Sequence, residues 1–117
     1  MSSPTRHTLE HCRAQGWLAC VVEHWIPRTQ VRVDLFGFGD VIALDGQPGA
    51  LLIQTTTTSH APNRVTKIKT ERRDNALAWL RADNRIVVHG WALRGAAGKR
   101  KLWTLKEYPV TMEMLDA

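Results

Sequence analysis

The sequence predicts an α/β (α+β) protein with a central mixed β-sheet of about five strands flanked by helices. Two observations indicate this class. Apolar runs of strand length alternate with turn-forming residues, and helical spacing of apolar side chains occurs at the start and again in the middle of the chain. The resulting order is helix, three strands, helix, two strands (αβββαββ). Because 117 residues suffice for one two-layer core, we expect a single domain over residues 1–117.

The first helix is predicted over residues 5–15, with Gly16 as its stop signal. A strand follows over residues 17–26 and is closed by Pro27. Residues 31–35 are rich in valine and continue in extended form toward a glycine-containing turn. These segments supply the helix and the first strand of the expected order.

Two further strands are expected over residues 41–44 and 51–56, joined by the turn-rich residues 45–49. Each strand has a polar residue where an interior strand would be apolar, Asp40 just before the first and Gln54 within the second. Two adjacent strands connected in this way would bring Asp40 and Gln54 together at one edge of the sheet.

The second half begins with residues 63–69 and 74–82, which are expected to form one interrupted helix or two short helices. Residues 85–93 form a strong strand pattern. A turn at residues 95–98, which contains two glycines, then returns the chain as a hairpin partner over residues 100–108. These elements complete the predicted order.

Composition and charge narrow the class of protein. With 44% hydrophobic and 23% charged residues the chain is an ordinary globular one, and a net charge of +5 favours an anionic partner, most simply nucleic acid. No apolar run approaches the roughly 20 residues of a membrane span, and no signal core follows the first residues. Cys12 and Cys20 lack zinc-ligand spacing, which favours a packing role. We therefore expect a cytoplasmic protein with no membrane partner.

The pair Asp40 and Gln54 predicts a divalent-metal pocket, because carboxylate and amide oxygens are ligands that hard cations prefer. Gly37 and Gly39 let the backbone turn tightly before Asp40. An aspartate in such a turn is often a local hydrogen-bond acceptor, and a glutamine at a strand end often bonds its neighbours. The metal interpretation is preferred for Asp40 because Gln54 accompanies it, whereas the two interpretations of Gln54 are about equal.

Residues 37–43, Gly-Phe-Gly-Asp-Val-Ile-Ala, and residues 51–56, Leu-Leu-Ile-Gln-Thr-Thr, resemble the PD-(D/E)XK, or restriction-endonuclease-like, nuclease superfamily. The nearest branch is that of Holliday-junction-resolvase-like and small phage nucleases, some with a Gln-x-Thr motif. The element order extends this resemblance over nearly the whole chain. It implies a metal-dependent DNA endonuclease that hydrolyses phosphodiester bonds, with branched or junction DNA as substrate, a homodimer as assembly, and a phage or prophage origin.

The resemblance also implies roles for individual residues. Asp40 stands where the superfamily has its metal-binding aspartate, Gln54 where it has a glutamate, and Thr56 where it has a lysine. A bound Mg²⁺ or Mn²⁺ would polarise the phosphoryl oxygen and acidify the attacking water. Gln54 removes one negative charge and Thr56 supplies no positive charge. The alternative is therefore a catalytically impaired DNA-binding or protein-interaction module on the same fold, such as a phage-encoded regulator.

Other residues could compensate for these two departures. Glu23 and Asp34 could each add a carboxylate, and Lys67 could replace the missing lysine on the following helix. Each has a simpler interpretation as a solvated or structural side chain. His60 and His89 have no second histidine at ligand spacing, so we favour structural roles for both.

Basic residues fall into two groups that could reach a phosphate backbone. The first follows the second motif, and the second flanks the last hairpin turn. Solvated surface charge is the competing interpretation. The five tryptophans are expected to be core or interface anchors. The predicted DNA-binding residues are Arg64, Lys67, Lys69, Arg72, Arg73, Lys99, Arg100 and Lys101, with Arg94 beside the last three.

Overall fold

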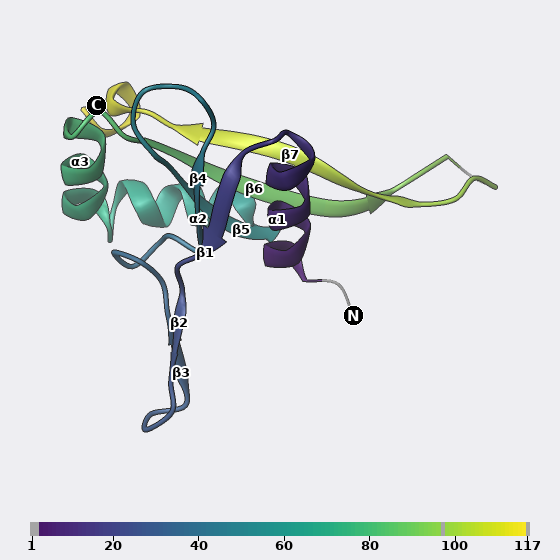
Figure 1. Cartoon of the computed structure of the whole chain (residues 1–117), viewed down its shortest axis with the longest axis horizontal. Coiled ribbons are helices and arrows are strands. Elements are labelled where there is room, and N and C mark those ends of the chain that lie inside the picture. Colours follow the sequence, from purple (N-terminus) through teal and green to yellow (C-terminus); the bar gives the residue numbers. More distant parts are fainter. Residues whose placement is uncertain (1–2, 97, 117) are drawn as a thin grey trace.

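A five-stranded mixed sheet forms the centre of the protein in a computed structural model that describes residues 3–96 and 98–116 (Figure 1). The strand order across the sheet is β1-β4-β5-β6-β7. Neighbouring strands are antiparallel except β5 and β6, which run parallel because two helices connect them. The strands are β1 (Leu18–Val21), β4 (Val41–Leu44), β5 (Leu51–Thr57), β6 (Arg85–Arg94) and β7 (Leu102–Val110).

Helices cover both faces of this sheet. Helix α1 (Pro4–Ala14) buries Cys12 against β4 and β5, where Ile53 points toward it. Helices α2 (Ala61–Lys69) and α3 (Arg73–Arg81) pack on the opposite face, to which the neighbouring residue Leu52 points. This alternation along β5 is the two-residue period of a strand buried on both sides. A short helix α4 (Met112–Leu115) follows β7.

The predicted mixed sheet of about five strands with flanking helices is confirmed. The single strand predicted over residues 17–26 is wrong, because the chain bends at Val22 and Glu23. Both of their backbone amides donate to the carbonyl of Asp40, at 2.9 and 3.4 Å, where β4 begins. The continuation β2 (His24–Ile26) pairs with β3 (Val31–Val33) in a separate two-stranded sheet. Figure 1 shows this β2–β3 arm, residues 24–33, projecting away from the main sheet.

The observed elements follow the order α1, β1, the β2–β3 arm, β4, β5, α2, α3, β6, β7 and α4. Of the two alternatives predicted after the second motif, one interrupted helix or two short helices, the structure has two short helices, α2 and α3. Strands β6 and β7 pair from Ile86↔Val110 to Arg94↔Leu102, as the hairpin prediction requires. Ala97, in the predicted turn at residues 95–98, lies outside the described residues. Within the described part of the chain, no helix is both long and apolar enough to cross a membrane.

A tight turn at residues 35–39 returns the chain from the β2–β3 arm to β4. Phe36 and Gly37 both have positive φ, 57° and 84°, and Leu35 bridges to Gly39. Side chains of α3 and of the residue before it secure the turn. Asn75 Nδ2 donates to the carbonyl of Phe36 at 3.0 Å, and Arg72 Nε donates to that of Gly37 at 3.2 Å. The start of β4 is therefore held between the arm and the helical layer.

Candidate metal centre

Three carboxylates converge where the β2–β3 arm joins the sheet. One oxygen from each of Glu23, Asp34 and Asp40 lies within 4.8 Å of the others. Because His24 pairs with Val33, Glu23 and Asp34 occupy the next opposing positions at the base of the arm. Asp40 precedes β4 directly. The bend at Glu23 and the turn before Asp40 thus create this carboxylate cluster from three separate segments.

Asp40 is the buried member of the cluster, with 6% of its surface exposed. Its backbone amide donates to the carbonyl of Ile53 at 2.9 Å, which extends the β4–β5 ladder by one residue. Its Oδ2 accepts hydrogen bonds from the backbone amide of Thr55 at 2.8 Å and from the Thr55 hydroxyl at 3.3 Å. These bonds fix the orientation of the carboxyl group before any ligand binds.

The pKa of Asp40 is raised to about 8, chiefly by burial. The Thr55 amide opposes this shift, while a hydrogen bond with Asp34 and the negative charges of Asp34 and Glu23 add to it. Three acids packed so closely cannot all ionise cheaply. Arg32 offers the one ion pair to them among the described residues, at 3.8 Å from Glu23, and its side chain is 67% exposed. A divalent cation would stabilise the ionised form of the cluster, so the donor set fits Mg²⁺ or Mn²⁺.

Gln54 lies beside this cluster. The pairing Val41↔Ile53 makes Gln54 the residue opposite Asp40, and opposing residues of an antiparallel pair project from the same face. Gln54 is 4% exposed, and none of the hydrogen bonds within the described residues involves its side chain. Its position across the strand pair from Asp40 makes its amide oxygen a candidate for one further ligand. Thr56 follows two residues later on the same face and is also buried.

Sequence reasoning missed the role of Thr55. Its side chain alternates away from Gln54 and Thr56, and its hydroxyl contacts Thr5 of α1 at 2.9 Å. The shorter of its two hydrogen bonds to Asp40 comes from its backbone amide, which any residue other than proline would supply, so the residue type gives little signal. Asp34 was predicted only as a secondary carboxylate, and its position opposite Glu23 follows from the hairpin register.

The basic residues predicted to bind DNA lie in different places. Arg72 is occupied with the carbonyl of Gly37, so it secures the turn before Asp40. Lys67 is half-buried on α2, and no ion pair joins it to the cluster within the described residues. Arg64, Lys69 and Arg73 are also half-buried, and no ion pair joins them to the cluster within the described residues. The second group is exposed near the end of the β6–β7 hairpin and consists of Arg94, Lys99, Arg100 and Lys101. This hairpin extends far beyond the helices in Figure 1.

The histidines lie outside the carboxylate cluster. His89 is fully buried in β6, and its Nδ1 lies 3.0 Å from the hydroxyl of Thr8 in α1. Burial lowers the pKa of His89 to about 3, with a smaller contribution from His11. His60 is exposed just before α2. Burial and the contact with Thr8 agree with a structural role for His89, whereas the His60 side chain makes no cap hydrogen bond to α2.

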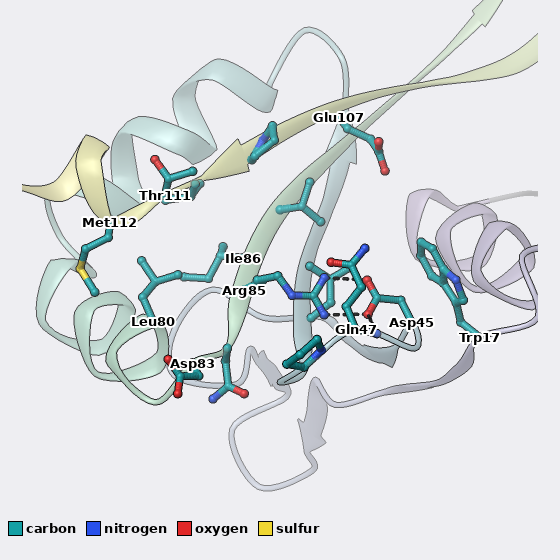
Figure 2. Close-up of a pocket in the computed structure, with 16 residues that line it drawn as sticks. Trp17, Asp45, Gln47, Leu80, Asp83, Arg85, Ile86, Glu107, Thr111 and Met112 are labelled. Carbon is teal, nitrogen blue, oxygen red and sulfur yellow. Dashed lines mark hydrogen bonds and ion pairs between the residues drawn. The ribbon is translucent and has the colours of Figure 1, made fainter.

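A cavity of about 750 Å³ lies at the other end of β4 and β5 (Figure 2). Trp17, Ile86 and Met112 contribute to its wall, and none of the three cluster carboxylates does. Arg85 and Asp45 form a bidentate ion pair there, with both distances at 2.6 Å. Hydrogen bonding to Arg85 lowers the pKa of Asp45, so its carboxylate neutralises the guanidinium. Arg85 and Asp45 therefore neutralise each other, and neither offers an unpaired charge to a ligand in the cavity.

Comparison with protein-family models, curated proteins and solved structures finds no significant match to the chain. The candidate metal centre at Glu23, Asp34, Asp40 and Gln54 therefore stands on its geometry.

Proposed function

We propose that the protein is a metal-dependent DNA endonuclease with a restriction-endonuclease-like fold. The observation that carries this proposal is the meeting of Glu23, Asp34 and Asp40 within 4.8 Å around a buried carboxyl group. Gln54, opposite Asp40, supports it as the source of a neutral oxygen ligand. A net charge of +5 supports an anionic substrate.

In this proposal Asp40, Glu23 and Gln54 hold Mg²⁺ or Mn²⁺, which would polarise the scissile phosphate and acidify a bound water. Thr55 keeps the Asp40 carboxyl group in place through its two hydrogen bonds. Asp34, a partly exposed carboxylate of the cluster, would accept the proton of the attacking water. Thr56 orients water through its hydroxyl. Lys67 is a weaker candidate, since no ion pair connects it to the cluster.

The substrate path in this proposal uses the basic residues of α2 and α3 and those of the β6–β7 hairpin. Such residues position DNA through its phosphates without reading its sequence. Branched or junction DNA, a homodimer and a phage or prophage origin belong to the proposal through the sequence resemblance alone.

The decisive experiment is a cleavage assay on supercoiled, single-stranded and four-way-junction DNA with Mg²⁺, Mn²⁺ or EDTA. We expect metal-dependent cutting that Asp40→Asn abolishes, since the amide keeps the shape of the carboxyl group and loses its charge. Asp116→Asn is the matched control, because Asp116 is an exposed aspartate near the C-terminus. Cutting that persists in Asp40→Asn would overturn the proposed site.

The second candidate is a DNA-binding or protein-interaction module that has lost nuclease chemistry, such as a phage-encoded regulator. It is favoured by the neutral Gln54 and by Thr56, which leaves the cluster without an adjacent lysine. DNA retardation that is unaffected by EDTA and by Asp40→Asn, with no cleavage on any substrate, would support this candidate and contradict the endonuclease.

A further inference from the structure

We infer that the β2–β3 arm is a DNA contact, which inserts into a groove of duplex DNA and presents the backbone to the carboxylate cluster. DNA binding by the arm is inferred from the residues of the arm alone. The further step, in which the arm places a phosphate beside a metal ion, rests on the proposed endonuclease function.

The composition of the arm fits an anionic partner. Its residues 24–33 include Arg28 and Arg32 and no acidic residue. Trp25 and Val31 are both 50% exposed, so the surface of the arm has an aromatic and an aliphatic side chain beside its arginines. Exposed basic and aromatic side chains on a two-stranded ribbon are features of a surface that contacts phosphates and bases.

The register of the arm places Trp25 and Arg32 on the same face as two of the carboxylates, Glu23 and Asp34. Trp25 pairs with Arg32, and the Arg32 guanidinium lies 5.9 Å from the centre of the Trp25 ring. Glu23 and Asp34 are the opposing residues two positions nearer the base. With a two-residue strand period, all four side chains project from one face of the ribbon. Two residues of strand span about 7 Å, so a strand of DNA held by Trp25 and Arg32 lies next to the cluster.

The base of the arm is attached directly to the residue that anchors the cluster. The amides of Val22 and Glu23 donate to the carbonyl of Asp40, and the amide of Leu35 donates to that of Gly39 at 2.8 Å. Both strands of the arm are therefore fixed on either side of Asp40. A nucleic acid bound along the arm has a defined position relative to the carboxylates.

Arg32 connects the arm and the cluster. Its ion pair with Glu23 is long, at 3.8 Å, and the guanidinium is largely exposed, so water screens the interaction. A DNA phosphate can replace Glu23 as the partner of the guanidinium at little cost in free energy. This exchange leaves Glu23 free to bind a cation. Removing Arg32 should therefore weaken DNA binding and strengthen cation binding.

Duplex DNA is the occupant that the arm fits best. The major groove, about 12 Å wide, admits a two-stranded β-ribbon. The arm projects from the body of the protein, as Figure 1 shows, so its end can enter a groove while its base stays beside the phosphates. Its positive charge without acidic residues is complementary to DNA.

The test is fluorescence anisotropy with labelled duplex and single-stranded DNA in EDTA, where no metal-dependent cleavage occurs. We expect Trp25→Ala and Arg32→Ala each to weaken duplex binding about five- to tenfold. Arg32→Ala should also reduce the slope of log Kd against log salt by about one, and Arg32→Lys should restore most of the binding. Arg13→Ala, which removes an exposed arginine near the end of α1 and outside the proposed substrate path, is the matched control.

Cation binding is measured separately by titration with Mn²⁺ in the absence of DNA. Arg32→Ala should bind Mn²⁺ more tightly, because one positive charge leaves the cluster. Duplex binding unchanged in both arm variants would overturn the inference even if the protein cleaves DNA. Arm-dependent duplex binding by a protein that neither binds Mn²⁺ nor cleaves DNA would support the DNA contact and overturn the endonuclease. A loss confined to single-stranded DNA would overturn the groove placement.

Discussion

The backbone amide of Thr55 donates to Asp40 Oδ2 at 2.8 Å, and the Thr55 hydroxyl approaches the same oxygen at 3.3 Å. Such bonds favour an ionised carboxylate, yet burial and the neighbouring acids outweigh them and raise the pKa of Asp40 to about 8. Without a cation, Asp40 is therefore largely protonated at neutral pH. The orientation of its carboxyl group is already fixed, so a bound metal ion would only have to displace the proton.

The raised pKa of Asp40 predicts a pH dependence of stability. Between its unfolded pKa of about 4 and its folded pKa of about 8, the folded state binds the extra proton, so the free energy of unfolding falls as pH rises. This stabilisation is complete below the unfolded pKa and lost above the folded one. In EDTA, we expect the midpoint of urea unfolding to decrease from pH 6.5 to 8.5, and Asp40→Asn to remove this decrease.

His89 acts in the opposite direction at lower pH. Its pKa is lowered to about 3, so its contribution to stability is lost as pH falls below the unfolded histidine pKa of about 6.5. The measurement is therefore made above pH 6.5, where Asp40 dominates. Mn²⁺ should displace the Asp40 proton, which makes Mn²⁺ affinity rise with pH toward 8. An unfolding midpoint with the same pH dependence in Asp40→Asn and in the unaltered protein would contradict the assignment.

Gln54→Glu tests whether Gln54 is a ligand. A carboxylate opposite Asp40 adds negative charge next to a bound cation, so we expect Mn²⁺ affinity to be kept or increased up to about tenfold at pH 8. Calorimetric titration measures it directly. Gln47→Glu, on an exposed turn, is the matched control and should change little. A clear loss of affinity in Gln54→Glu would show that the amide does not contact the ion.

Gly39→Ala tests the turn that delivers Asp40. A Cβ on Gly39 would lie only 2.6 Å from Leu52 Cγ, which is well inside normal contact distance. We expect a loss of about 1–3 kcal/mol in the free energy of unfolding and weaker Mn²⁺ binding, because the start of β4 must shift. Combining it with Leu52→Ala should give a smaller total loss than the two single changes added together. Strict additivity would indicate that this contact is not the cause.

Much of the sheet was predictable from the sequence because its strands have simple apolar patterns. Most residues of β4, β5 and β6 are buried, and local turns separate these strands from the elements that flank them. The break between β1 and β2 was not predictable in the same way. No glycine or proline interrupts residues 18–26. The bend arises from the bonds of Val22 and Glu23 to Asp40, which is distant in sequence.

The candidate site was predictable in part for a similar reason. Asp40 and Gln54 face each other through a hairpin whose register follows from a short connection. Asp34 and Glu23 meet Asp40 only because the β2–β3 arm folds as a separate hairpin. The sequence predicts Lys67 near the site, because it lies on the helix that follows Gln54 and Thr56, yet no ion pair joins it to the cluster within the described residues. The tertiary positions of the arm and of α2, which local sequence patterns do not specify, therefore decide which side chains reach Asp40.

Thr8→Val tests the network that holds α1 against the sheet. Trp91 Nε1 can only donate, and it donates to Thr8 Oγ1 at 2.9 Å. We expect the Thr8 hydroxyl to donate in turn to His89 Nδ1, which lies 3.0 Å away. This arrangement would place the His89 proton on Nε2, 3.4 Å from Glu107 Oε1. Valine keeps the shape of threonine but leaves two buried groups without partners. We expect a loss of about 2–4 kcal/mol in urea unfolding, whereas Thr29→Val, at an exposed site, should change stability by less than about 0.5 kcal/mol. Equal stabilities of the two variants would contradict the network, and a nitrogen NMR shift of His89 identifies the ring nitrogen that bears the proton.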